Sequence, residues 1–181
     1  MHNKIPAKFY FINSFKKNNI DNLDNNTAII YRNYNKKLNI KEIIKIKEYC
    51  SKKKIKFILS NNLKITLSLN LDGGYIPSFK KDFSHLNYNF RSNFLLLGSA
   101  HNLKEVRIKE RQKVKIIFIS SLFKKNKNYL GIYKFKNLAS LTKKIIVALG
   151  GISKINEKRL KILNCYGFSG KIGRASCRER V

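Results

Sequence analysis

The sequence predicts an α/β protein, a closed (β/α)8 barrel of parallel strands. Short runs of β-branched and aromatic residues recur along the chain, and amphipathic stretches with helical spacing separate them. Parallel strands need long crossover connections, so this alternation favours a parallel sheet. The eight strand-like runs favour closure into a barrel, although the periodicity is also compatible with an open doubly wound sheet.

The predicted elements alternate in order along the chain. The strands are expected at residues 8–13, 27–32, 55–59, 72–76, 94–98, 114–120 and 144–149, and from residue 165 onward. The helices are expected at residues 40–54, 103–112 and 152–163, with a helical turn around 135–142. The first of these helices ends in Lys52, Lys53 and Lys54, whose positive charge suits a helix C-terminus.

We expect one barrel domain over residues 1–171 and a foreign tail over residues 172–181. The tail has three arginines but no lysine or asparagine, and it resembles the in-frame translation of a sequencing adapter. The native part of the eighth strand would then stop at Gly170. We therefore expect that strand and the last helix to be incomplete, and barrel closure to belong to a longer parent protein.

The chain is strongly basic, with a formal net charge of +29 and a pI near 10.2. Such a charge is typical of nucleic-acid or anionic-membrane binding. However, 31 Lys, 22 Asn and 24 Ile against 8 Arg is also the composition expected from A/T-rich coding DNA, and the lysines are scattered. We favour a solvated lysine surface and keep nucleic-acid binding as an alternative.

Several kinds of protein are disfavoured by the sequence. Its apolar runs are far shorter than the roughly 20 residues of a membrane span, and its N-terminus lacks the pattern of a signal peptide. We expect a cytoplasmic protein without membrane association. The three cysteines, Cys50, Cys165 and Cys177, have no pairing or metal-binding spacing, so we expect reduced thiols without a role.

Two adjacent glycines, Gly150 and Gly151, follow the predicted seventh strand. At the carboxyl end of a barrel strand, such glycines allow backbone N–H groups to face a phosphate. A Gly-Gly pair by itself is more often a tight turn. The pair is therefore a candidate phosphate site only in the context of a barrel.

Other polar residues stand at the ends of predicted strands, where barrel enzymes place their chemistry. They include Arg32, Ser60, Asn61, Tyr75, Ser99 and His101. Arg32 suits a phosphate or diphosphate because its guanidinium donates two parallel hydrogen bonds, although a lone Arg after a strand is usually a rim residue. No partner carboxylate is evident for Ser99 or His101, so a capping or structural role competes with acid–base chemistry.

Seven short segments follow the order and spacing of a known family's motifs. They are Ile30-Tyr31-Arg32, Ile58-Leu59-Ser60-Asn61, Leu71-Asp72-Gly73-Gly74-Tyr75-Ile76, Gly98-Ser99-Ala100-His101-Asn102, Ser120-Ser121-Leu122-Phe123, Leu130-Gly131-Ile132 and Leu149-Gly150-Gly151-Ile152. Together they make residues 8–170 resemble thiamine phosphate synthases and their TenI-like relatives. The family counterparts include Gln-Leu-Arg, Ala-Asp-Gly-Val-His-Leu and Ile-Gly-Gly-Ile.

The resemblance implies a transferase of thiamine biosynthesis on a (β/α)8 barrel with Mg²⁺. Such an enzyme joins a hydroxymethylpyrimidine diphosphate to a thiazole phosphate and releases pyrophosphate. The resemblance places Arg32, Ser60 and Ser99 against the pyrimidine diphosphate and Gly150-Gly151 against the thiazole phosphate. Lys125 or Lys127 would replace the family's loop lysine.

The chain departs from the family pattern at three charged positions. Asn61 stands where the family has a magnesium-binding Asp, Lys80 stands near its later acidic partner, and Tyr34 replaces a Lys. Asn61 and Asp82 are the remaining candidates for the metal, although Mg²⁺ prefers carboxylate oxygens. These departures keep open a TenI-like thiazole tautomerase in which His101 transfers the proton.

Overall fold

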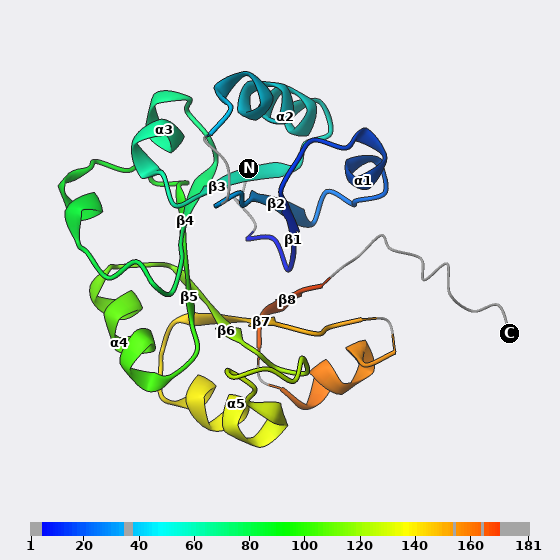
Figure 1. Ribbon diagram of the computed structural model, residues 1–181, viewed down its shortest axis with the longest axis vertical. Coiled ribbons are helices and arrows are strands. Elements are labelled where there is room, and N and C mark those ends of the chain that lie inside the picture. Colours follow the sequence, from blue (N-terminus) through cyan, green and yellow to red (C-terminus); the bar gives the residue numbers. More distant parts are fainter. Residues whose placement is uncertain (1–4, 35–37, 154, 164, 171–181) are drawn as a thin grey trace, which may run out of the picture.

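In the computed structural model, which describes residues 5–34, 38–153, 155–163 and 165–170, the chain forms a closed barrel of eight parallel strands (Figure 1). The strands are β1 (Lys8–Ile12), β2 (Thr27–Tyr31), β3 (Lys56–Ser60), β4 (Gly73–Ile76), β5 (Leu95–Ala100), β6 (Ile116–Ser120), β7 (Ile145–Leu149) and β8 (Gly167–Ser169). Each strand pairs with its neighbour in sequence order, which confirms the predicted fold class.

Helices cover the outside of this barrel (Figure 1). They are α1 (Lys17–Asp21), α2 (Ile40–Lys52), α3 (Leu63–Ser68), α4 (Leu103–Arg111) and α5 (Gly131–Ser140), with 3-10 helices η1 (Ser84–Asn87) and η2 (Glu157–Ile162). Helix α2 buries Ile43, Ile46 and Cys50 against the strands, as its helical spacing predicts. Burial raises the pKa of the Cys50 thiol to about 12.

None of the helices in the described ranges is long and apolar enough to cross a membrane.

The barrel closes through a strand of only three residues, β8. Phe168 and Ser169 pair with β7 on one side, and the same two residues pair with β1 on the other. Gly167 is required here because a Cβ atom at this position would lie 2.0 Å from the carbonyl oxygen of Ala7. The prediction that closure belongs to a longer parent protein is therefore wrong. The tail expected over residues 172–181 lies outside the described residues, so the expectation that the last helix is incomplete stays a prediction.

The helix predicted over residues 152–163 is also wrong in extent, since among the described residues of this range η2 is the only helical segment. Asn156 explains the late start. Its side chain accepts a hydrogen bond from the Ser153 N–H at 2.9 Å and donates one to the Gly151 carbonyl at 2.8 Å. These two hydrogen bonds close a turn after β7. Asn side chains that bond to nearby backbone groups in this way compete with helix formation.

Aromatic rings fill the barrel interior below the carboxyl ends of the strands. Phe118 packs edge to face with Phe9 and Tyr75, with ring centroids 4.9 and 5.5 Å apart. Phe11 packs edge to face on Tyr75 at 5.4 Å. Edge-to-face pairs of this kind are favourable and restrict ring orientation. The rings form a rigid floor beneath the residues that follow the strands.

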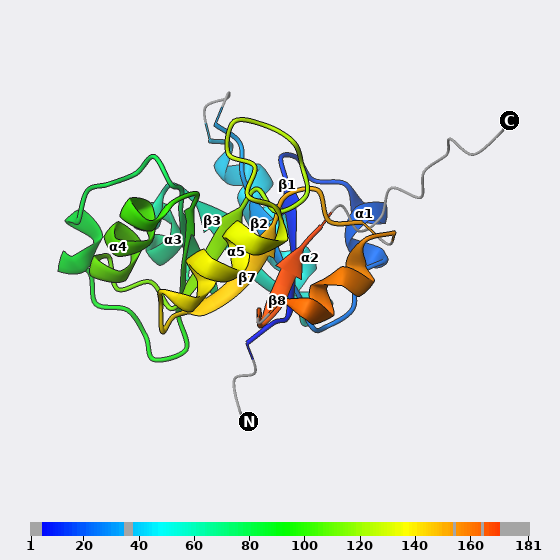
Figure 2. The same cartoon turned by 90° about the horizontal axis from the view of Figure 1, so that it is seen from below.

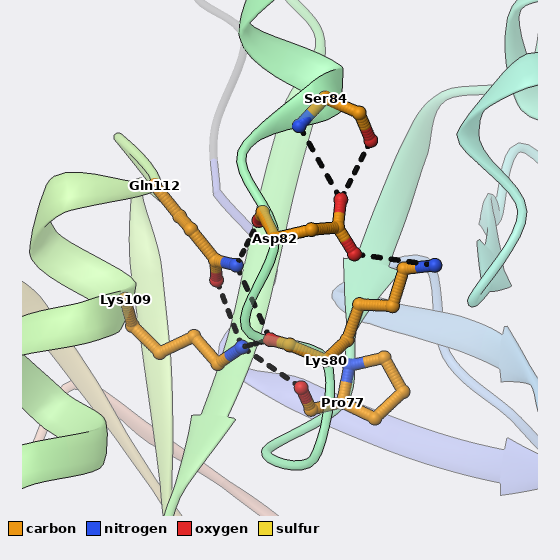
Figure 3. A network of polar contacts seen from close by, with 6 residues as sticks. All are labelled: Pro77, Lys80, Asp82, Ser84, Lys109 and Gln112. Atoms are coloured by element: carbon orange, nitrogen blue, oxygen red, sulfur yellow. Dashed lines mark hydrogen bonds and ion pairs between the residues drawn. The ribbon is translucent and has the colours of Figure 1, made fainter.

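A buried lysine on α4 fixes the loop after β4 (Figure 3). The Lys109 side chain is fully buried, and its ammonium donates hydrogen bonds of 2.8 Å to the carbonyls of Pro77 and Lys80 and to Gln112 Oε1. The Gln112 amide in turn donates to the carbonyls of Lys80 and Asp82 at 3.2 and 2.6 Å. A buried charge is tolerated only when its donors are satisfied, as they are here.

The position of Lys109 has a consequence for stability at alkaline pH. Burial lowers its pKa from 10.5 to about 8, against the opposing charges of Glu105 and Asp82. Between these pH values the unfolded chain holds a proton that the folded chain has lost, so the contribution of Lys109 to the free energy of unfolding rises with pH. By linkage, this rise has an upper bound of roughly 3 kcal/mol.

We therefore expect the stability difference between the unaltered chain and Lys109→Met to increase from pH 8 to pH 10.5. Urea unfolding followed by circular dichroism at several pH values measures it. Lys104→Met, which removes the same charge from an exposed position on the same helix, is the control against which the rise is measured. A constant difference for Lys109→Met would contradict the assignment of a buried ammonium.

Candidate active site

Loops at the carboxyl ends of the strands gather at one end of the barrel. Figure 2 shows the long loop after β6 rising on one side of the barrel. All eight strands run parallel, so every loop that follows a strand opens toward this end. Two cavities lie here, and Tyr75 at the end of β4 lines both.

The first cavity, called here the mouth cavity, has a volume of about 160 Å³. Its lining residues are Arg32, Tyr34, Tyr75, Pro77, Ser78, Phe79, Ser99, His101, Ser120 and Leu149. It brings together four sequence-predicted site residues, Arg32, Tyr75, Ser99 and His101, from three different strand ends. Burial raises the pKa of the Tyr75 hydroxyl, so this group is a neutral hydrogen-bonding partner.

Arg32 supplies the positive charge of the mouth cavity. Its backbone N–H donates to the Ile12 carbonyl at 2.7 Å, and its guanidinium carbon lies 4.5 Å above the centre of the Phe11 ring. Stacking on an aromatic face orients a guanidinium without using its N–H donors. No carboxylate within the described ranges forms an ion pair with it. The donors of Arg32 are thus available to an anionic ligand.

His101 has a carboxylate partner, contrary to the expectation from the sequence. Glu105 Oε2 lies 2.9 Å from His101 Nδ1 and accepts a hydrogen bond of 2.7 Å from the His101 backbone N–H. The Glu105 N–H donates to the side chain of Asn102, the N-cap of α4, at 3.0 Å. The i, i+4 spacing of the two residues in the sequence is the pattern that could have indicated this pair. Because Glu105 occupies Nδ1, the ring presents Nε2 as its free nitrogen.

An aromatic pair lies at the rim of the mouth, and its second member, Phe79, was not singled out from the sequence. Tyr34 and Phe79 pack edge to face with centroids 5.4 Å apart, and the two residues are 45% and 59% exposed. The Tyr34 hydroxyl lies 2.9 Å from the hydroxyl of buried Ser60. Ser60, predicted to contact substrate, therefore reaches the mouth through Tyr34.

The second cavity, called here the side cavity, has a volume of about 230 Å³. Its lining residues are Asn61, Asn62, Leu63, Lys64, Tyr75, Ile76, Lys80, Asp82, Ser84, His85 and Tyr88. The two candidate metal ligands, Asn61 and Asp82, thus line one cavity. The His85 ring is held by its Nε2, which lies 2.8 Å from the Gln112 carbonyl.

The donors in the side cavity do not fit Mg²⁺. Asp82 is the only carboxylate among the described residues that line it. Its Oδ1 accepts from the Ser84 N–H and hydroxyl at 3.3 and 2.6 Å, and its Oδ2 lies 3.3 Å from Lys80 Nζ. The bond from Ser84, together with Lys80, lowers the pKa of Asp82. A cation there would compete with an ammonium already in place. Among the described residues, no cluster of three His, Cys, Asp or Glu side chains could hold a metal ion.

The remaining predicted residues lie outside both cavities. Gly150 and Gly151 have positive φ angles of 104° and 76°, and a Cβ atom on them would lie 2.6 Å from Ser121 Oγ and 2.5 Å from the Lys124 nitrogen. The loop after β6 thus packs directly on the glycines. Lys125 and Lys127 lie exposed on that loop. The phosphate-binding roles of these four residues stay predictions.

Known proteins match this chain in sequence and in fold. The family model for thiamine monophosphate synthase (TMP-TENI) matches residues 21–169. A thiamine-phosphate synthase from Prochlorococcus marinus subsp. pastoris is 30% identical over 138 residues, which cover 72% of this chain and 38% of the relative. Another from Fusobacterium nucleatum subsp. nucleatum is 24% identical over 148 residues, 78% of this chain and 72% of that protein. The chain thus spans well under half the length of the Prochlorococcus relative.

Solved structures share the barrel. A thiamine phosphate pyrophosphorylase from Pyrococcus furiosus superposes with a TM-score of 0.73 at 17% identity, covering 92% of this chain and 86% of that one. A citrate synthase variant has a TM-score of 0.67 at 9% identity, covering 91% and 85%. Barrels of this kind carry different chemistries, so this likeness speaks for the fold alone. The sequence match over residues 21–169 decides the family, and the chain belongs to the thiamine monophosphate synthase family.

Proposed function

We propose that the chain is a thiamine phosphate synthase, which joins a hydroxymethylpyrimidine diphosphate to a thiazole phosphate and releases pyrophosphate. In this reaction the bond between the pyrimidine methylene carbon and the diphosphate oxygen breaks, and its electron pair leaves with pyrophosphate. The thiazole nitrogen supplies the pair for the new C–N bond. The protein's task is to hold two anionic substrates and to stabilise the charge that grows on the leaving group.

The observation that carries this proposal is the guanidinium of Arg32, which has no ion-pair partner among the described residues and shares one cavity with Ser99 and His101. Its two parallel donors suit a diphosphate oxygen pair. Because Arg32 already rests on Phe11, little reorganisation is needed when charge develops on the ligand. The family membership of the chain supports the same assignment.

The aromatic residues of the mouth cavity suit the planar rings of such substrates. Tyr34, Tyr75 and Phe79 line it together with the apolar side chains of Pro77 and Leu149. Ring stacking and edge-to-face contacts bind a heteroaromatic ring without requiring charge. We assign the ring to this apolar side of the cavity and the diphosphate to the side that Arg32 faces.

Arg32→Met is expected to lower kcat/KM for thiamine phosphate formation by about 10²–10³, the loss typical of removing one electrostatic donor to a developing anion. The full chain is supplied with both precursors, and thiamine phosphate and pyrophosphate are quantified together. Arg107→Met is the matched control, because Arg107 lies exposed on α4 and pairs with Glu110 at 2.7 Å. No product from the folded chain, or equal losses in the two variants, would contradict the proposal.

A thiazole tautomerase is the second candidate, and the His101–Glu105 pair favours it. A tautomerase moves a proton between two positions of one substrate. An imidazole whose orientation a carboxylate fixes is suited to that step. This reaction needs neither a diphosphate leaving group nor a metal.

If the chain is a tautomerase, His101→Gln should reduce the interconversion of thiazole phosphate isomers by about 10²–10⁴, the usual contribution of one acid–base group. Glu105→Gln should give a smaller loss in kcat with KM unchanged, because Glu105 orients the ring without touching the substrate. Proton NMR of the isomer mixture measures both rates. Undiminished conversion in His101→Gln would exclude the residue from the mechanism.

A further inference from the structure

We infer that the side cavity is a metal-free diphosphate site, in which Lys80 and Lys64 provide the positive charge that the family resemblance assigns to Mg²⁺. The inference rests on the proposed function, because it names the site that receives the leaving group. The side-cavity donors fit a divalent cation poorly, and the charges that line the cavity suit an anion.

The charge balance of the side cavity favours an anion. Two lysines, Lys64 and Lys80, line it against the single carboxylate of Asp82. Asp82 accepts a hydrogen bond from Ser84 through Oδ1 and lies 3.3 Å from the Lys80 ammonium through Oδ2, an exposed ion pair that a more highly charged anion can displace. Asn61 and Asn62 add neutral amides, which can donate hydrogen bonds to phosphate oxygens.

Lys80 is fixed at its backbone and free at its side chain. Its carbonyl accepts hydrogen bonds from Lys109 Nζ at 2.8 Å and from Gln112 Nε2 at 3.2 Å (Figure 3). Its side chain is 48% exposed. A strongly hydrated, mobile ammonium can move from Asp82 to a more highly charged ligand without rearrangement of the loop.

The position of the side cavity relative to the mouth cavity suits one substrate that occupies both. Tyr75 lines both cavities, and the loop after β4 contributes Pro77, Ser78 and Phe79 to one and Lys80 and Asp82 to the other. A ring in the mouth cavity thus places an attached diphosphate between Arg32 and the side cavity. The cationic side chains of Arg32, Lys64 and Lys80 then surround the diphosphate, which carries several negative charges.

Inorganic pyrophosphate is the probe for this site. Isothermal titration calorimetry on the full chain at fixed ionic strength, with EDTA present, should show binding. Lys80→Met should weaken it at least tenfold, whereas Lys81→Met should change it less than twofold. Lys81 is the matched control because it is exposed, removes the same charge and lines neither cavity. Absence of binding in EDTA, or equal effects of the two variants, would overturn the inference.

A gain-of-metal variant provides the reciprocal test. Asn61→Asp combined with Lys80→Asp places two new carboxylates beside Asp82, a donor set that hard cations prefer. In this variant pyrophosphate binding should vanish in EDTA and return with Mn²⁺. Broadening of the free Mn²⁺ signal in electron paramagnetic resonance reports the bound metal. Pyrophosphate binding that persists in EDTA at the unaltered affinity would contradict the role of Lys80.

These binding tests are independent of product formation. A chain that binds pyrophosphate through Lys80 yet makes no thiamine phosphate would refute the proposed function and leave the anion site standing. A chain that forms thiamine phosphate but binds pyrophosphate only with a divalent cation would refute the anion site and leave the proposed function standing.

Discussion

The buried ammonium of Lys109 is the interaction on which the geometry of the site depends. Desolvating a charge is costly, and here three acceptors compensate it, two of them carbonyls of the loop after β4. That loop lines both cavities. If the loop shifted, Phe79 would leave the mouth cavity and Lys80 would leave the side cavity. The hydrogen bonds of Lys109 thus fix the residues that give the two cavities their shape and charge.

The barrel and its site differ in how closely they follow the family. The sequence match spans almost every strand and helix, and the rings of Phe9, Phe11 and Phe118 pack edge to face inside the barrel. The departures Tyr34, Asn61 and Lys80 all face one of the two cavities. If the resemblance holds at these positions, an aromatic ring, an amide and an ammonium stand where the family has a lysine and metal-binding carboxylates. Such changes alter how charge is supplied at the mouth while the packing of the barrel is kept.

The sequence predicted the strands well because buried parallel strands are short apolar runs, as Thr27–Tyr31 and Ile116–Ser120 are. It also placed Arg32, Ser99 and His101 in one cavity, since a parallel sheet gathers its strand ends. Lys109 could not be recognised, because a lysine on an amphipathic helix normally faces solvent. Its burial depends on acceptors from a loop about thirty residues earlier in the chain.

Amide hydrogen exchange at Lys80 tests most directly whether Lys109, and not a metal, holds the loop. The Lys80 N–H donates to the Pro77 carbonyl at 3.1 Å, the same carbonyl that Lys109 binds. We expect slow exchange at this amide that is equal in EDTA and in Mg²⁺ and becomes fast in Lys109→Met. Exchange that slows only when Mg²⁺ is added, or that Lys109→Met leaves unchanged, would contradict this account.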